Sequence, residues 1–168
     1  MKGKKLFGKF NVVDIVVVVL VIAMIAVVAV KIFGSKATDI VAAKTTLYTE
    51  IEVIGAAPRL IEETGRQKDT LIGTRLVSGN EYMNATVEDI WFEDYYNDVQ
   101  CADGSIVYSM SPDKKNIVFL IKTEVAEGTP SPKIGSQEVR SGRTFIIKTQ
   151  TFETSGTIRY VNFGEYTK

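Results

Sequence analysis

The sequence predicts a mainly β protein, with one N-terminal transmembrane α-helix followed by a small β-barrel or β-sandwich domain that carries one short helix. Two observations predict this fold class. Every residue from Ile15 to Val30 is apolar, which is typical of a helix that crosses a bilayer. From residue 47 onward, short runs rich in β-branched and aromatic residues alternate with Gly, Pro and Asp, a pattern typical of strands and turns.

The N-terminal part of the chain is predicted to be a basic cytoplasmic stub over 1–10 and a transmembrane helix over 11–33. As a helix, residues 15–33 would span roughly 28 Å at about 1.5 Å per residue, close to the thickness of a bilayer core. More lysines precede this segment than closely follow it, which favours a cytoplasmic N-terminus and an extracytoplasmic C-terminal domain. A cleaved signal peptide is the alternative, but its apolar region would be shorter, about 7–15 residues.

Polar residues at both ends of the apolar run define the expected membrane anchor. Asn11 is placed as an N-cap, and Asp14 follows three residues later in the position of the acid in a capping box. The carboxylate of Asp14 would also meet the positive end of the helix dipole. At the other end, Lys31 can extend its ammonium group outward to the headgroups. The anchor is therefore expected to be delimited by Asn11, Asp14, Ile15, Val30 and Lys31, and the lipid bilayer is the first expected partner.

The remainder is predicted to be a juxtamembrane linker over 34–45, with the helix ending at Gly34-Ser35, and an extracytoplasmic mostly-β domain over 46–168. One short helix is expected over 57–65, because Pro58 suits a first helical position and Gly65 suits a stop. The segment 111–116 is expected to be a turn, and 127–132 a loop. The strands are expected at 47–53, 105–110, 116–122, 144–152 and 156–163, with a turn around Glu153, Ser155 and Gly156.

The outer segment contains a faint internal repeat. Residues 72–82 resemble 134–145, and residues 86–92 resemble 157–163, with Gly79 aligned to Gly142. The repeat predicts two related β-hairpin units packed into one barrel or sandwich. The alternative is that Ile-Gly and Ser-Gly strings recur by chance in turn-rich sequences.

Composition argues against most catalytic chemistry. The chain has no histidine and one cysteine, Cys101, so the usual Ser-His-Asp, Cys-His and zinc arrangements are not available. The sequence Ser111-Pro-Asp-Lys114 matches Ser-x-x-Lys but lies between strand-like runs, whereas that motif opens a helix in penicillin-binding enzymes. Residues 1–36 carry six Lys and one Asp, so the remainder of this neutral chain is acidic and a poor candidate for nucleic acid. No catalytic residue, cofactor or metal site is predicted.

One segment, 88–104, interleaves carboxylates with aromatic rings and contains no Lys or Arg. Aromatic rings and carboxylates together could bind a sugar, and several carboxylates could hold Ca²⁺, although the spacing fits no EF-hand loop. The simpler interpretation is structural: the rings cover the core or an edge, and the acids keep that edge soluble and unpaired. The candidate ligand patch consists of Trp91, Asp94, Tyr95, Tyr96 and Asp98.

The chain resembles a family of uncharacterised bacterial single-pass membrane proteins that is known only as a domain of unknown function. The resemblance rests on FGKFNVVDIVVVVLVI near the start and IGSQEVRSGRTFIIKTQTFETSGTI near the end, and it covers essentially the whole chain. Its most specific parts are Gly8, Asn11 and Asp14, and the triplet 156–158 (Gly-Thr-Ile). The resemblance implies one membrane span and an extracytoplasmic β domain, and it implies no activity.

Location and the absence of catalytic motifs together predict a membrane-tethered, non-catalytic binding or assembly module of the bacterial cell envelope, with a protein partner or a second copy as its ligand. A pilin-like filament subunit is one alternative, because Phe10 and Asp14 precede a long apolar helix as in type IV pilins. Lys9 in place of glycine, and the expected helix end at Gly34, disfavour it. A glycan-binding accessory to surface polymer assembly is the other alternative.

Overall fold

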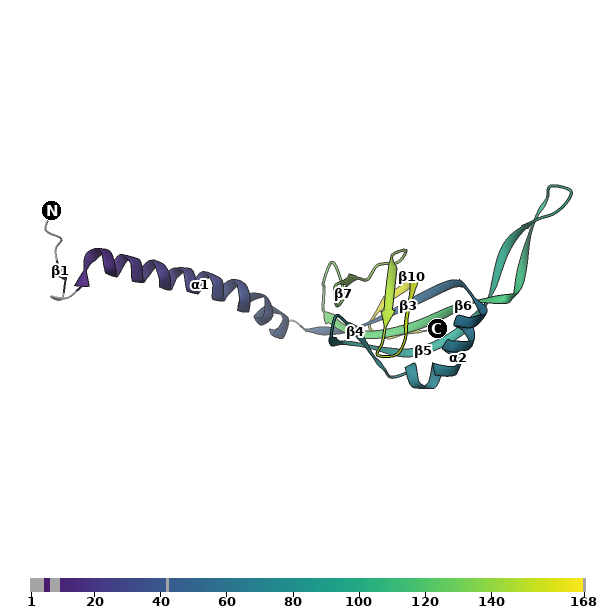
Figure 1. Ribbon diagram of the computed structural model, residues 1–168, viewed down its shortest axis with the longest axis horizontal. Coiled ribbons are helices and arrows are strands. Elements are labelled where there is room, and N and C mark those ends of the chain that lie inside the picture. Colours follow the sequence, from purple (N-terminus) through teal and green to yellow (C-terminus); the bar gives the residue numbers. More distant parts are fainter. Residues whose placement is uncertain (1–4, 7–9, 42, 168) are drawn as a thin grey trace. The chain divides into compact units, whose positions relative to one another are not determined.

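Figure 1 shows the computed structural model of the chain, which describes the backbone of residues 5–6, 10–41 and 43–167. Side chains are described for residues 15–29 and 43–167. The chain divides into two compact units, Met1–Ala43 and Lys44–Lys168. Every buried hydrophobic residue of the core belongs to the second unit, which therefore has a core of its own.

The first unit consists of a two-residue ladder, β1 (Lys5–Leu6) with β2 (Phe10–Asn11), followed by helix α1 (Val12–Val41). The helix continues through Gly34, so the predicted helix end at Gly34-Ser35 is wrong. A single glycine costs a helix only about 1 kcal/mol relative to alanine, which is too little to stop it here. The linker predicted over 34–45 is accordingly helical as far as Val41.

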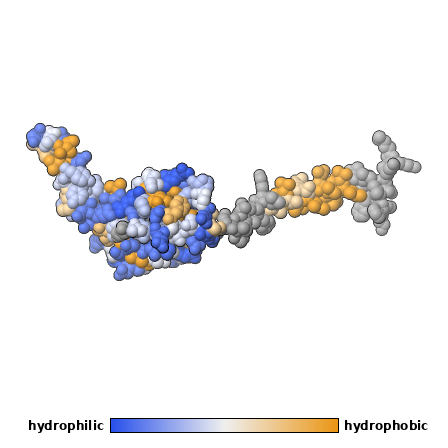
Figure 2. All heavy atoms as spheres, turned by 180° about the vertical axis from the view of Figure 1, so that it is seen from behind, coloured by the Kyte–Doolittle hydropathy of each residue, from blue (hydrophilic) through white to orange (hydrophobic). Residues whose placement is uncertain are grey.

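The described side chains of α1 are uniformly apolar (Figure 2), and Ile15 is 42% exposed. The side chains of the other expected anchor residues, Asn11, Asp14, Val30 and Lys31, lie outside the described residues. In the part of the chain that the structure describes, no helix combines the length and the apolar character that crossing a membrane requires.

The second unit is a six-stranded antiparallel sheet with one helix. The strand order is β4-β5-β6-β3-β10-β9, and the edge strands β4 and β9 contact each other. The sheet is therefore a nearly closed barrel. The elements are β3 (Lys44–Ala56), α2 (Pro58–Leu71), β4 (Arg75–Ser78), β5 (Glu81–Gln100), β6 (Ile106–Ala126), β9 (Thr144–Lys148) and β10 (Glu153–Phe163), with a separate ladder of β7 (Lys133–Ile134) and β8 (Gln137–Glu138).

The core forms because strand residues alternate between the two faces of the sheet. On β3, Leu47, Thr49 and Ile51 are all fully buried while their neighbours are partly exposed. The amphipathic helix α2 adds Leu71 to the same core. The largest fully buried side chains include Phe119 and Phe145. The predicted strands at 47–53 and 116–122 and the loop at 127–132 are confirmed.

Three local predictions are wrong. The helix does not stop at Gly65 but runs to Leu71. The segment 111–116 is no turn, because β6 continues through it. It forms an irregularity in the β5–β6 pairing: Asp94 pairs with Lys115 and Tyr96 with Met110, so four residues of β6 lie opposite Tyr95 alone. The turn of the hairpin lies instead at 101–105.

The predicted turn at 153–156 is also wrong, because these residues begin β10 and pair with β9. Gly156 is needed there for space: a Cβ atom would lie 2.6 Å from the carbonyl oxygen of Glu52 on β3. The turn falls at 149–152, where Thr149 N donates to Phe152 O at 2.8 Å. Aromatic rings of Phe119 and Phe152 pack in the core beneath it, 5.8 Å apart.

The predicted repeat of two hairpin units has a partial counterpart, because the hairpins β4–β5 and β9–β10 lie at opposite edges of the sheet. The residues that the repeat aligns, however, do not occupy equivalent positions in these hairpins. Gly79, with φ of 61°, lies in the β4–β5 turn, whereas Gly142, with φ of 86°, precedes β9. In the hydrogen-bond pattern Gly142 corresponds to Gly73, because their N–H groups donate to Ile158 O and Val87 O respectively, both at 2.7 Å. The aligned glycines therefore have different structural roles.

Replacement of Gly156 by alanine is expected to lower the free energy of unfolding by about 1–3 kcal/mol, the usual cost of overpacking. The matched control is Gly65→Ala in α2, where no atom lies within 4 Å of the added Cβ and where alanine should raise stability by about 0.5–1 kcal/mol. Urea unfolding of both variants measures the two effects. Equal stability of Gly156→Ala and the parent would contradict the close β3–β10 approach.

Candidate binding surfaces

The structure separates the five residues of the predicted ligand patch. Trp91 lies on the outer face of the barrel beside Arg159, whose guanidinium carbon is 5.6 Å from the indole centroid. Asp94 forms an exposed ion pair with Lys115 at 3.5 Å. The ring of Tyr95 lies against Gly55.

The other two patch residues, Tyr96 and Asp98, lie farther along β5, past the irregular pairing opposite Tyr95. Tyr96 stacks on Tyr108 of β6 with ring centroids 5.3 Å apart, and Asp98 pairs in register with the same Tyr108. The acidic-aromatic segment is therefore distributed along a strand and does not form a single site.

A polar network around Arg159 forms the most connected cluster on the described surface. Arg159 Nε donates to Glu50 at 2.6 Å, and its two terminal nitrogens donate to Glu93 at 2.8 and 2.9 Å. A third carboxylate, Glu52, lies 3.6 Å away. The bonds to Glu93 and Glu50 raise the pKa of Arg159 further above its ordinary value, although partial burial opposes this.

Arg159 lies on the same outer side of the sheet as an unusual buried stretch of β6. Val118 and Leu120 point away from the core, yet they are 0% and 4% exposed. Val118 pairs with Trp91 on one side and with Glu52 on the other. Arg159 comes from β10 and bonds Glu93 on β5, so its side chain crosses the outer face of β3 and β6, the two strands between them.

The same network borders an open groove of about 550 Å³, lined by Glu50, Trp91, Glu93, Arg159, Tyr160 and Thr167. Tyr166 donates its hydroxyl to Glu50, one of these lining residues, at 2.6 Å. Burial, followed by this bond to a carboxylate, raises the pKa of Tyr166 to about 12. The described residues contain no group of three or more acids, cysteines or histidines that could hold a metal ion.

A second surface is the end of the β5–β6 hairpin, residues 96–110, which extends away from the barrel (Figure 1). We call it the arm. β4 pairs with β5 only as far as Thr86, and β3 pairs with β6 only from Lys115 onward. Both outer edges of the arm are thus free of strand partners among the described residues. Its exposed large apolar side chains, 43–69% exposed, are Tyr96, Val99, Ile106, Val107, Tyr108 and Met110.

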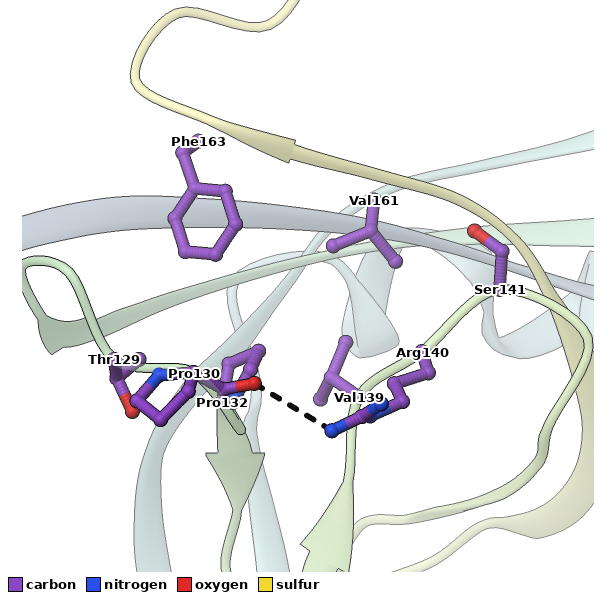
Figure 3. Close-up of a pocket in the computed structure, with 8 residues that line it drawn as sticks. All are labelled: Thr129, Pro130, Pro132, Val139, Arg140, Ser141, Val161 and Phe163. Carbon is purple, nitrogen blue, oxygen red and sulfur yellow. Dashed lines mark hydrogen bonds between the residues drawn. The ribbon is translucent and has the colours of Figure 1, made fainter.

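A third surface is an apolar pocket of about 360 Å³ beside the end of β10. Figure 3 shows Val161 and Phe163 of β10 pointing toward Pro130 and Pro132 of the loop. Val139 forms the buried floor, and the rim is completed by Thr129, Arg140 and Ser141. Arg140 and Arg143 both bind Glu138, so the rim residue Arg140 shares one carboxylate with a second cation.

Replacement of Arg159 by methionine is expected to lower the free energy of unfolding by about 2 kcal/mol, because it removes charged hydrogen bonds and leaves three carboxylates close together. Lys148→Met is the control. Lys148 forms an exposed ion pair with Glu153 at 3.0 Å, and such pairs contribute about 0–1 kcal/mol. Chemical denaturation measures both, and similar losses in the two variants would refute a structural role for Arg159.

The raised pKa of Tyr166 makes part of the stability pH-dependent. The neutral phenol is favoured by folding, so its contribution is complete below pH 10 and is lost as the pH rises toward about 12. The Tyr166→Phe variant should therefore lose less stability than the parent between pH 10 and pH 12. Absorbance titration should also show one of the seven tyrosines ionising late in the parent only. If the titration curves of the parent and of Tyr166→Phe, each normalised to its number of tyrosines, superimpose, the Tyr166–Glu50 bond is contradicted.

Comparison with known proteins places the chain without adding an activity. No curated protein and no solved structure matches it. A family model described as a domain of unknown function, DUF4330, matches residues 2–162, which is nearly the whole chain and includes the arm and most residues of the other two surfaces. The chain therefore belongs to the DUF4330 family.

Proposed function

We propose that this protein is a membrane-tethered, extracytoplasmic and non-catalytic binding or assembly module of the bacterial cell envelope, and that the arm is its binding element. The observation that carries the proposal is the exposure of six large apolar side chains on a hairpin that has no packing partner in the described chain. Contiguous exposed apolar side chains of this kind mark interaction sites.

The arm contributes little to the stability of the barrel. The barrel core is complete without it, because no core residue lies between Phe92 and Ile117. A two-stranded hairpin is only marginally stable alone in water, and Ile106 and Tyr108 are each 69% exposed. Contact with a protein partner would bury these side chains and pair the free strand edges, so the arm is suited to binding.

The tether and the location are supported by the sequence. The uninterrupted apolar run from Ile15 to Val30 lies within α1, and lysines are concentrated before it. Such a run favours lipid over water, and the lysines favour a cytoplasmic N-terminus. In this proposal the barrel and its arm are displayed outside the membrane.

A non-catalytic role is supported by the chemistry of the chain. There is no histidine, and the Ser-x-x-Lys string lies inside β6, where Ser111 Oγ is 3.4 Å from Asp113. This string has neither the helix start nor the neighbouring motifs that activate such a serine.

The glycan-binding alternative has one observation in its favour, namely that Trp91 and Tyr160 line the open groove. However, Arg159 lies against the face of Trp91, which occupies a surface that a sugar ring would stack on. The pilin-like alternative gains from the continuation of α1 to Val41, while Lys9 still stands where a prepilin peptidase expects glycine. Both remain weaker than the arm as a basis for function.

The proposal predicts that the arm is protected from hydrogen exchange only when its partner is present. In the purified full chain at high dilution, amides of 96–110 should exchange rapidly, because the hairpin has solvent on both edges. In native membranes the same amides should be protected, whereas those of the buried half of β6 should be protected in both. The matched variant Ile106→Asp/Tyr108→Asp should lose arm protection in membranes and retain the barrel. Rapid arm exchange in both preparations of the parent would refute the proposal.

A further inference from the structure

A second free strand edge lies beside the apolar pocket. β10 pairs with β3 along 157–163, but with β9 only as far as Thr157. Within the described residues, no strand therefore pairs with the β9-facing side of Tyr160–Phe163. Val161 and Phe163 of this same stretch line the pocket. An open strand edge next to a side-chain pocket is the arrangement that binds an added β-strand, because the edge supplies backbone bonds and the pocket supplies specificity.

The arm supplies a strand with matching properties. Its β6 side, residues 106–110, contains no charged residue and no proline, and so lacks the features that normally protect a strand edge from pairing. Ile106, Tyr108 and Met110 are all more than half exposed. An aliphatic or aromatic side chain from this strand is of the size that a pocket of about 360 Å³ accommodates.

The charges of the two surfaces are complementary. The arm carries Asp98 and Asp103 and no Lys or Arg. At the pocket rim Arg140 shares the carboxylate of Glu138 with a second cation, Arg143, and the exposed Lys133 is nearby in sequence. Opposite charges at the rim of an interface favour one orientation and one partner. Two arms brought together would instead place their aspartates close to each other, which disfavours arm-to-arm pairing.

We propose that the partner of the arm is a second copy of this chain, whose open β10 edge and adjacent pocket receive strand 106–110 in a head-to-tail contact. This inference rests on the proposed function of the arm. The contact is heterologous, so each copy offers one arm and one pocket, and repetition gives a chain or a ring. Tethering in one membrane would raise the effective concentration of both surfaces.

Site-specific crosslinking of the purified full chain in detergent tests the geometry. Cys101, the native cysteine, lies in the turn at the end of the arm. With Ser141→Cys at the pocket rim, a short bismaleimide should link Cys101 of one copy to the new cysteine of the next and give a ladder of dimers and larger species. Asp69→Cys, on the exposed side of α2, is the control and should give no ladder. Efficient crosslinking of the parent through Cys101 alone would show that arms meet each other and would overturn the inference.

Complementation of two variants provides a second readout. The arm variant is Ile106→Asp/Tyr108→Asp, and the pocket variant is Arg140→Asp/Phe163→Asp, all at exposed positions. Each alone should lose self-association by at least about tenfold, as expected when a central contact is removed. Mixed together they should form dimers and nothing larger, because each retains the surface that the other lacks. Ile54→Asp, at an exposed apolar residue outside both surfaces, should associate like the parent.

Failure of this inference is distinguishable from failure of the proposed function. If the pocket variant associates normally, or if the parent is monomeric at every concentration, the second copy is not the partner. The arm is then a binding element for a different protein if its amides are still protected in native membranes. Unprotected arm amides would remove the proposed function as well.

Discussion

Strand β6 is the constraint on which the rest of this domain depends, because one continuous strand has two opposite environments. In its second half, five consecutive residues from Ile117 to Ile121 are buried, so both faces of the strand are covered. In its first half, Ile106, Val107 and Tyr108 are all exposed. The two halves are joined at the irregular pairing opposite Tyr95. The buried half pairs with β3 on one side and β5 on the other, so the arm extends directly from the central strands of the sheet.

Burial of β6 on both faces requires a cover on the outer side of the sheet, and the side chain of Arg159 crosses that side from β10 to β5. Arg159 lies at the pairing irregularity of β10, between Ile158 and Tyr160. An extra residue at such a bulge redirects its side chain, and here the guanidinium reaches carboxylates on β3 and β5. The aliphatic stem of arginine can cover apolar surface while its charged end is bonded. The polar side chains that border the adjacent groove are therefore bonded to one another for structural reasons. This leaves the arm as the better basis for the functional proposal.

The sequence predicted those parts of the fold that depend on local pattern. Alternation in 47–53 and the apolar run 116–122 identified β3 and the buried half of β6, and Pro58 marked the start of α2. Glu50 and Glu52 share a face of β3, since they are alternate residues of one strand. The sequence could not pair them with Arg159, because that contact depends on strand order and on a bulge far away in the chain. Pro112 suggested a turn, but proline is tolerated in a strand at a bulge or an edge. Gly65 suggested the end of helix α2, but packing of the helix overrode this local preference. The sequence did not predict the arm, because its exposure also depends on long-range strand pairing, namely on where β3 stops pairing with β6.

An exposed strand with apolar side chains is a hazard for any protein, because free edges pair with other chains. Within the arm, the β5 side carries Asp98 and the turn carries Asp103, whereas the β6 side from Ile106 to Met110 carries no charge. Ser105 N and Oγ both donate to Asp103, at 3.0 and 2.7 Å, and these bonds lower the pKa of this carboxyl group. The end of the arm therefore stays negatively charged over a wide pH range and repels other arms, while one edge stays open to pairing. The arm therefore has one edge protected by charge and one edge open to pairing. A single open edge allows one ordered contact with a partner strand and limits indiscriminate aggregation.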